Sequence, residues 1–181
     1  MVNFSSIEQR WQSEWERAKI GQVEIDKKRK KFFITFAYPG ISGYQHLGHM
    51  RSYTYTDILS RYKRMQGFNV LFPIGTHASG NQAIAFANKI KNKNEDWIKY
   101  LKDNDYNDNI KDLEDTFKIV DYFNKNYVET WKKFGFIFDS RRFTCTIYED
   151  YKKFIEWQFK KLNNLKLLVK KPYYATFCPK D

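Results

Sequence analysis

The three histidines of the chain, His46, His49 and His77, are its most concentrated chemical feature. The first two belong to a segment that reads Y-P-G-I-S-G-Y-Q-H-L-G-H and directly follows an apolar run. Their spacing of three residues would place both rings on one face of a helix. Imidazoles in that position can donate hydrogen bonds to negative charge that develops on a transferring phosphoryl group. No serine–histidine–carboxylate set is evident, so the pattern does not favour nucleophilic catalysis.

Glycines lie around the histidines and suit the same chemistry. Gly40, Gly43 and Gly48 carry no side chain where a phosphate would press against the backbone. A helix beginning near Leu47 would add free N–H groups and the positive end of its dipole. The simpler alternative is that the histidines are ordinary helix-cap, loop or buried residues without a ligand.

The flanking elements predict how these residues are positioned. Residues 32–37 form a continuous apolar run, typical of a strand buried on both faces of a parallel sheet. A helix is expected at about 47–66 and a second apolar strand at 69–74. This order predicts a right-handed parallel unit that binds ligands at the carboxyl ends of its strands, where the histidines would converge. The inward stripe of the helix is predicted to be Tyr53, Ile58, Leu59 and Tyr62.

The predicted fold class is therefore α/β, with a Rossmann-like parallel sheet followed by a helical connective segment. Helices are expected from a capping box at Ser5, with Glu8 three residues later, to about Gly21, and at 82–103, 113–134 and 149–164. Residues 103–115 are polar and predict a loop or tolerated insertion; a calcium loop is disfavoured because its glycine and terminal glutamate are missing. Short strands are expected at 167–169 and 173–177. We divide the chain into residues 1–90, the histidine-bearing half of a nucleotide-binding domain, and 91–181, the connective segment.

Composition narrows the class of protein. The net charge of +11 over 181 residues favours a polyanionic partner, with nucleic acid first, although a biased composition and a solvated surface could give the same excess. Aromatic residues make up 19% of the chain and are expected mainly in the core. No signal peptide or membrane-spanning run is recognisable, so we expect a cytoplasmic protein that meets no membrane.

The two cysteines, Cys145 and Cys178, form neither a disulfide framework nor a complete zinc site, and no metal ligands are assigned. We interpret Cys178 as an ordinary cysteine. The alternative is that it is one ligand of an incomplete zinc knuckle. Arg141 and Arg142 are interpreted as a solvated turn, with contact to a nucleic acid as the alternative.

The H-L-G-H element is the signature of class I aminoacyl-tRNA synthetases, and the resemblance extends along the chain in order. The sequence resembles the N-terminal part of a leucyl-tRNA synthetase of the archaeal and eukaryotic cytosolic type. Isoleucyl and valyl enzymes are the related alternatives, but the G-T-H-A-S-G and closing C-P-K-D segments favour the leucyl branch. The matching segments are the N-terminal helix with its two tryptophans, the strand and H-L-G-H loop, and residues 61–73, 75–80, 154–159 and 174–181.

The resemblance implies a class I leucine–tRNA ligase that activates leucine with ATP (with Mg²⁺) and transfers it to tRNA(Leu). It assigns His46 and His49 as catalytic. It implies ATP binding by Tyr38, Pro39, Gly40, Gly43, His46, Leu47, Gly48 and His49. It implies amino-acid binding by Ala37, Tyr38, Gly40, His77 and Gly80.

The resemblance also carries departures. The family usually has an aromatic residue where this chain has Gly40 and an apolar residue where it has Gln45, so the glycine would enlarge the leucine pocket. In the family, C-P-K-D leads into an editing insertion, followed by the half that bears K-M-S-K-S. We therefore expect the complementary synthetase half as a partner. The alternative is a catalytically inactive paralogue that binds tRNA or a partner protein.

Overall fold

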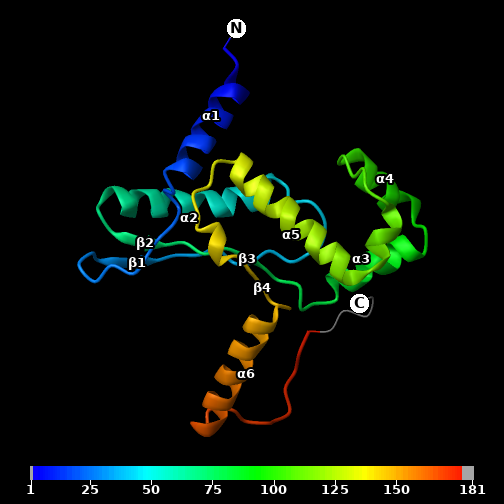
Figure 1. Ribbon diagram of the computed structural model, residues 1–181. Coiled ribbons are helices and arrows are strands. Elements are labelled where there is room, and N and C mark those ends of the chain that lie inside the picture. Colours follow the sequence, from blue (N-terminus) through cyan, green and yellow to red (C-terminus); the bar gives the residue numbers. More distant parts are fainter. Residues whose placement is uncertain (1, 177–181) are drawn as a thin grey trace.

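Residues 31 to 71 form the expected strand–helix–strand unit (Figure 1). In the computed structural model, which describes residues 2–176, β1 (Lys31–Phe33) pairs in parallel with β2 (Asn69–Leu71). The helix α2 (Leu47–Met65) connects the two strands, and Phe32 is in register with Val70. The predicted α/β class and parallel pairing are confirmed, in a shorter sheet than the sequence indicated.

Both predicted strands end early. β1 stops short of residue 37, and the strand predicted at 69–74 stops at Leu71. Pro73 has no N–H for a sheet ladder, so pairing cannot continue through it. The chain pairs again as β3 (Gly75–Thr76), which lies parallel to β4 (Thr144–Cys145), a strand that the sequence did not indicate.

The segment after β3 differs from the prediction in two places. The single helix expected at 82–103 is two helices, α3 (Gln82–Lys91) and α4 (Glu95–Asp103). They separate because Lys93 adopts a φ of 52° and Asn94 caps α4, its side chain accepting a hydrogen bond from the Trp97 N–H at 3.1 Å. The loop expected at 103–115 contains the 3₁₀ helix η1 (Ile110–Glu114) and contributes Tyr106 and Leu113 to the core.

The helix α5 (Thr116–Lys133) is the centre of the core and begins three residues later than predicted. Asp115 sets this start, because its carboxylate accepts the N–H groups of Phe117 and Lys118 at 2.8 and 3.0 Å. The expectation of an aromatic core is confirmed here, where rings from α2, α3 and α5 pack with Phe72, the residue that follows β2. The largest buried rings are Trp131, Tyr127, Phe72, Phe86 and Phe123.

The buried face of α2 is not the predicted stripe. Tyr53 is buried as expected, but the other three predicted positions, Ile58, Leu59 and Tyr62, are exposed. The helix instead turns Met50, Tyr53, Asp57 and Ser60 inward. Asp57 is tolerated there because it accepts the Ile137 N–H at 2.8 Å and pairs with Arg61 at 2.6 Å.

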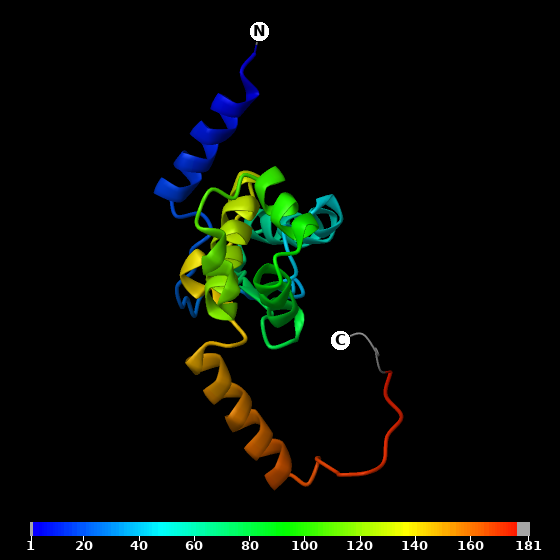
Figure 2. The ribbon, with the colours of Figure 1, turned by 90° about the vertical axis from the view of Figure 1, so that its right-hand side faces the viewer.

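The helices α1 (Phe4–Arg17) and α6 (Glu149–Asn164) extend away from the body on opposite sides, as Figures 1 and 2 show. No residue of either helix is buried, so their aromatic residues are not the core residues that the composition suggested. α6 has the predicted bounds. The start predicted for α1 was wrong, because Asn3 rather than Ser5 caps it, its side chain accepting the Ser6 N–H at 3.1 Å.

A short 3₁₀ helix, η2 (Ser140–Arg142), leads into β4. The strands predicted at 167–169 and 173–177 were wrong for residues up to 176, which form no strand; residue 177 lies outside the described part of the chain. Aromatic and β-branched residues favour a strand only when a neighbouring strand is present to pair with, and in the described part of the chain these residues pair with none.

Candidate nucleotide-binding site

The loops that follow β1 and β3 meet at one edge, as the sequence predicted. The backbone of Gly40 pairs in parallel with that of His77. The His77 N–H donates to the Pro39 carbonyl at 2.8 Å, and the Ile41 N–H donates to the His77 carbonyl at 3.2 Å. His77 is therefore fixed beside the glycine-rich loop, although it lies far along the chain from it.

His46 and His49 form a reciprocal cap at the start of α2. The Gly48 N–H donates to His46 Nδ1 at 3.1 Å, and the His46 N–H donates to His49 Nδ1 at 3.3 Å. The two ring centroids are 4.2 Å apart. Because both Nδ1 atoms accept, each neutral ring carries its proton on Nε2 and has that N–H available as a donor.

Gly48 makes this cap possible. A Cβ on Gly48 would lie 2.7 Å from His46 Cε1 and 2.9 Å from its Nδ1, closer than real Cβ contacts. The glycine predicted for close approach of a phosphate thus also admits the His46 ring over the first turn of α2. The sequence suggested free N–H groups at this turn, but the Gly48 N–H already donates to His46 Nδ1. A phosphate oxygen that bound this N–H would have to replace His46 Nδ1 as its acceptor.

Electrostatics keep His49 neutral near pH 7. Partial burial, and then the neighbouring His46, lower the pKa of His49 below its ordinary value, against a smaller opposite effect of its bond to the His46 backbone. His46 is exposed and His49 is half-buried. His49 therefore presents a neutral Nε2–H donor at the start of α2 rather than a fixed positive charge.

Tyrosines from distant helices hold the glycine-rich loop in place. The Tyr127 hydroxyl, in α5, is placed to donate to the carbonyls of Gly43 at 2.5 Å and Gly40 at 3.2 Å. Burial raises the pKa of Tyr127, which keeps this donor protonated. The Tyr44 N–H donates to the Tyr100 hydroxyl of α4 at 2.8 Å. Sequence analysis missed both tyrosines, because no local pattern relates them to the loop.

Gly43 is required by the backbone itself. Its φ of 125° lies in the region that side chains rarely adopt, and a Cβ there would meet the Tyr100 hydroxyl at 2.8 Å. The loop conformation, and with it the position of His46, therefore depends on a glycine at 43.

Only some of the residues expected to bind the amino-acid substrate lie next to one another. Gly40 and His77 are adjacent through their backbones, and the Tyr38 ring packs on Gly75, 2.7 Å from where a Cβ would stand. Ala37 is exposed, directly before Tyr38. Gly80 lies in an exposed turn, where a Cβ would meet no atom within 4 Å. Of the residues expected on ATP, Pro39 is buried and Leu47 is 78% exposed.

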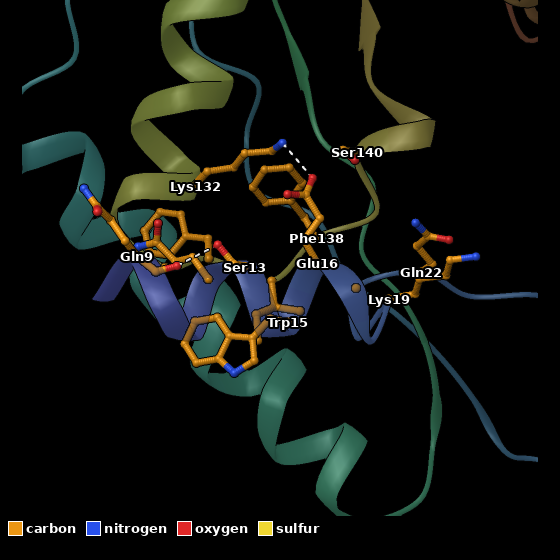
Figure 3. Close-up of a pocket in the computed structure, with 14 residues that line it drawn as sticks. Gln9, Ser13, Trp15, Glu16, Lys19, Gln22, Lys132, Phe138 and Ser140 are labelled. Carbon is orange, nitrogen blue, oxygen red and sulfur yellow. Dashed lines mark hydrogen bonds and ion pairs between the residues drawn. The ribbon is translucent and has the colours of Figure 1, made fainter. Parts of the chain in front are cut away.

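Two hollows in the surface lie away from the two histidines of the candidate site. Figure 3 shows one of about 280 Å³ between α1 and the end of α5, crossed by the Glu16–Lys132 ion pair at 3.3 Å. Another, of about 440 Å³, lies against β1 and β2 and is lined largely by apolar side chains. Neither is lined by His46 or His49.

Within residues 2–176, no helix has the length and apolar character needed to cross a membrane. No group of three histidine, cysteine, aspartate or glutamate side chains in the same range could hold a metal ion. Cys145 is a buried free thiol. The question of zinc at Cys178 falls outside the described residues.

Sequence comparison decides the family. The family model described as "tRNA synthetases class I (I, L, M and V)" matches residues 9–181. The chain belongs to this family. The class I resemblance drawn from the H-L-G-H element is thereby confirmed.

Curated relatives point to the leucyl branch. The chain is 39% identical to the leucine–tRNA ligase of Archaeoglobus fulgidus over the whole chain and 20% of that protein. It is 42% identical to the leucine–tRNA ligase of Pyrococcus furiosus over 98% of the chain and 19% of that protein. The chain thus corresponds to the N-terminal part, about a fifth of the length, of the curated relatives that it matches.

A solved structure supports the fold. The agnB2 LeuRS of Agrobacterium radiobacter K84, solved in a ternary complex with tRNA and LeuAMS, superposes with a TM-score of 0.67 at 22% identity. The match covers 92% of this chain and 19% of that one. At this identity the likeness establishes the fold alone.

Proposed function

We propose that this chain forms the ATP- and leucine-binding half of a leucyl-tRNA synthetase, with His46 and His49 as its catalytic residues. The observation that supports the proposal most directly is the reciprocal histidine cap. Both Nδ1 atoms are occupied by backbone N–H groups, which directs each Nε2–H away from the helix start. Two imidazole donors whose ring centroids lie 4.2 Å apart suit the oxygens of one polyphosphate.

Activation joins the leucine carboxylate to the α-phosphoryl group of ATP and releases pyrophosphate. The charge that grows on the phosphoryl oxygens would be stabilised by the two Nε2–H donors. The residues present fit ATP, since Gly43 allows the loop conformation and Gly48 keeps the helix start uncrowded. Mg²⁺ usually retains waters and binds through phosphate oxygens, so it would arrive with ATP rather than on a protein cage.

The edge formed by Tyr38, Gly40 and His77 is the proposed amino-acid site. Its supports are the pairing of Gly40 with His77 and the packing of Tyr38 on Gly75. This edge adjoins the histidine-bearing loop, which would bring a leucine carboxylate and the phosphates together. Ala37 and Gly80 belong to the same proposal as flanking positions.

The sheet surface supports the proposed need for a complementary half. Parallel sheets are normally covered on both faces. Here Phe33 of β1 is 63% exposed beside the apolar hollow that also includes Leu71 and Ile25. We propose that the partner is the synthetase half that carries K-M-S-K-S, and that the complete assembly acts on tRNA(Leu) in the cytoplasm.

Variants can separate donor chemistry from helix capping. Asparagine is a preferred N-cap residue, so His46→Asn retains a cap while removing the imidazole donor. Glutamine at the third helical position completes a capping box, so His49→Gln does the same for the second ring. Ser52→Ala, at an exposed position one turn further along α2, is the matched control.

The assay is leucine-dependent pyrophosphate exchange, with the chain alone and with the complementary half added. Exchange is expected only in the combined preparation. Each histidine variant should lower kcat by about 10²- to 10³-fold, whereas Ser52→Ala leaves it unchanged. No exchange in either preparation of the wild-type chain would contradict the proposal and support the inactive paralogue that binds tRNA or a protein.

A further inference from the structure

The side chain of Gln82 occupies the space that Gly40 leaves open. A Cβ on Gly40 would lie 2.1 Å from Gln82 Oε1, 3.1 Å from its Cδ and 3.4 Å from its Nε2. Any side chain larger than hydrogen at position 40 would therefore collide with this carboxamide. The expected enlargement of the pocket by Gly40 is therefore offset, because the side chain of Gln82, the first residue of α3, fills the space beside the glycine.

The base of the Gln82 side chain is held firmly. The next residue, Ala83, is buried, as are Phe86 and Ile90 on the same face of α3. α3 therefore cannot shift without disturbing the core. Gln82 itself is exposed, so the carboxamide end of its side chain can move at the site edge.

We propose that Gln82 is a specificity-determining residue, which sets the size of the amino-acid side chain accepted beside Gly40 and His77. This inference rests on the function proposed above, and it adds a residue that the family resemblance did not assign. The family usually has an aromatic ring at position 40. Because this chain has glycine there, the flexible side chain of Gln82 borders the proposed amino-acid site instead. Shortening that side chain would enlarge the space available to an aminoacyl group.

Three substitutions test the assignment. Gln82→Ala shortens the side chain at position 82 and should admit a larger amino-acid side chain. Gln82→Met restores similar length without the amide and should restore discrimination by size. Gly40→Ala should force Gln82 aside in the wild-type background but be accommodated in the Gln82→Ala background, so the two changes should not be additive. Gln82 is exposed, so its variants should fold, and thermal unfolding of all the variants is the check on their folding.

The experiment uses non-hydrolysable leucyl and phenylalanyl sulfamoyl adenylates, with dissociation constants measured by calorimetry on the purified chain with its complementary half. Gln82→Ala is expected to reduce the preference for the leucyl over the phenylalanyl compound by about tenfold or more. Gln82→Met should return the preference to within about threefold of the wild-type ratio. Ile84→Ala, at an exposed position on α3, is the control and should leave the ratio unchanged.

The outcomes distinguish the two proposals. If the leucyl compound binds and Gln82→Ala leaves the preference unchanged, the role of Gln82 is wrong and the proposed function stands. If Gln82→Ala weakens both compounds equally and also lowers thermal stability, Gln82 is a structural filler and the inference fails. If the wild-type assembly binds neither compound, the proposed function itself fails, and this inference fails with it.

Discussion

Tyr127 and Gly43 are joined by a hydrogen bond of 2.5 Å, from the phenol of the central core helix to a carbonyl of the glycine-rich loop. The same hydroxyl lies 3.2 Å from the Gly40 carbonyl. The loop that presents His46 is therefore attached to the best-packed part of the molecule. The loop belongs to the proposed domain of residues 1–90, but its conformation depends on α5, which belongs to the segment after residue 90.

Removing this hydroxyl should release the loop. Tyr127→Phe leaves the buried Gly43 carbonyl without this donor, whereas the Gly40 carbonyl still accepts the Ser42 N–H at 3.1 Å. The change should lower the free energy of unfolding by about 1 to 3 kcal/mol. Because the loop carries the candidate phosphate site, ATP affinity should weaken as well. Urea denaturation and ATP titration measure the two effects. Tyr55→Phe, at an exposed position on α2, should change neither quantity; an unchanged stability in Tyr127→Phe would contradict the proposed role.

Gln45 should be a site where the chain can be stabilised. Both atoms of its carboxamide, Oε1 and Nε2, are shielded from solvent and have no hydrogen-bond partner within residues 2–176. The family resemblance already marked this position as one where an apolar residue is usual. Gln45→Leu should raise the free energy of unfolding by about 1 to 3 kcal/mol, because it removes two unsatisfied polar groups at similar volume.

The matched control is Gln9→Leu, at an exposed position on α1, which should change stability by less than about 0.5 kcal/mol. Chemical denaturation of the two variants gives the comparison. A loss of stability in Gln45→Leu would indicate that the carboxamide is satisfied by bound water, and this prediction would then be wrong.

Asp139 should make the fold sensitive to acid. Its carboxylate is fully buried and accepts from Arg141 Nε at 2.9 Å, Arg141 Nη2 at 2.8 Å and the Val23 N–H at 3.3 Å. Burial favours the neutral acid, but these bonds outweigh it and lower the pKa of Asp139. Arg141, interpreted from sequence as part of a solvated turn, is thus engaged with Asp139 and Glu24.

A carboxyl whose folded pKa is lowered stabilises the fold above its unfolded pKa of about 4. That stability is lost as the pH falls from this value through the folded pKa. Asp139→Asn should cost about 2 to 3 kcal/mol at pH 7 and flatten the stability curve below pH 4. Denaturation midpoints between pH 7 and 2.5 test this, with Asp121→Asn on the exposed face of α5 as the control.

The features that sequence predicted well are those set by local pattern. The apolar run, the glycine-rich loop and the helix start near Leu47 follow each other directly, so their order implies a parallel unit with a ligand edge. The pairing of Gly40 with His77 follows from that topology. The resemblance to class I synthetases added the family, which the sequence comparison confirmed.

The features that it missed depend on partners distant in sequence. The α2 stripe was predicted from apolar side chains, whereas the buried face includes Asp57, whose partner Ile137 is 80 residues away. Tyr127 is 84 residues from Gly43, and no local signal joins them. Gln82 was not singled out, because its importance arises only from the space beside a glycine on another loop.

His49 provides a final prediction, on pH. Because its pKa is lowered in the folded chain, the unfolded chain takes up a proton first as the pH falls through about 6.5. The free energy of unfolding should therefore decrease below that pH and level off once the folded ring is protonated. Protonation also removes the Nδ1 acceptor that holds the His46 N–H. His49→Gln should lose this dependence.

Proton NMR of the imidazole Cε1–H resonance measures the effect directly, with a midpoint for His49 below that of a free imidazole. His46→Asn removes the second cause of the lowered pKa and should move the His49 midpoint upward, although partial burial remains. Binding of ATP should move it upward too, since the phosphates favour the charged ring. A His49 midpoint at or above 6.5 in the ligand-free chain would contradict the neutral His49 donor proposed for the phosphate site.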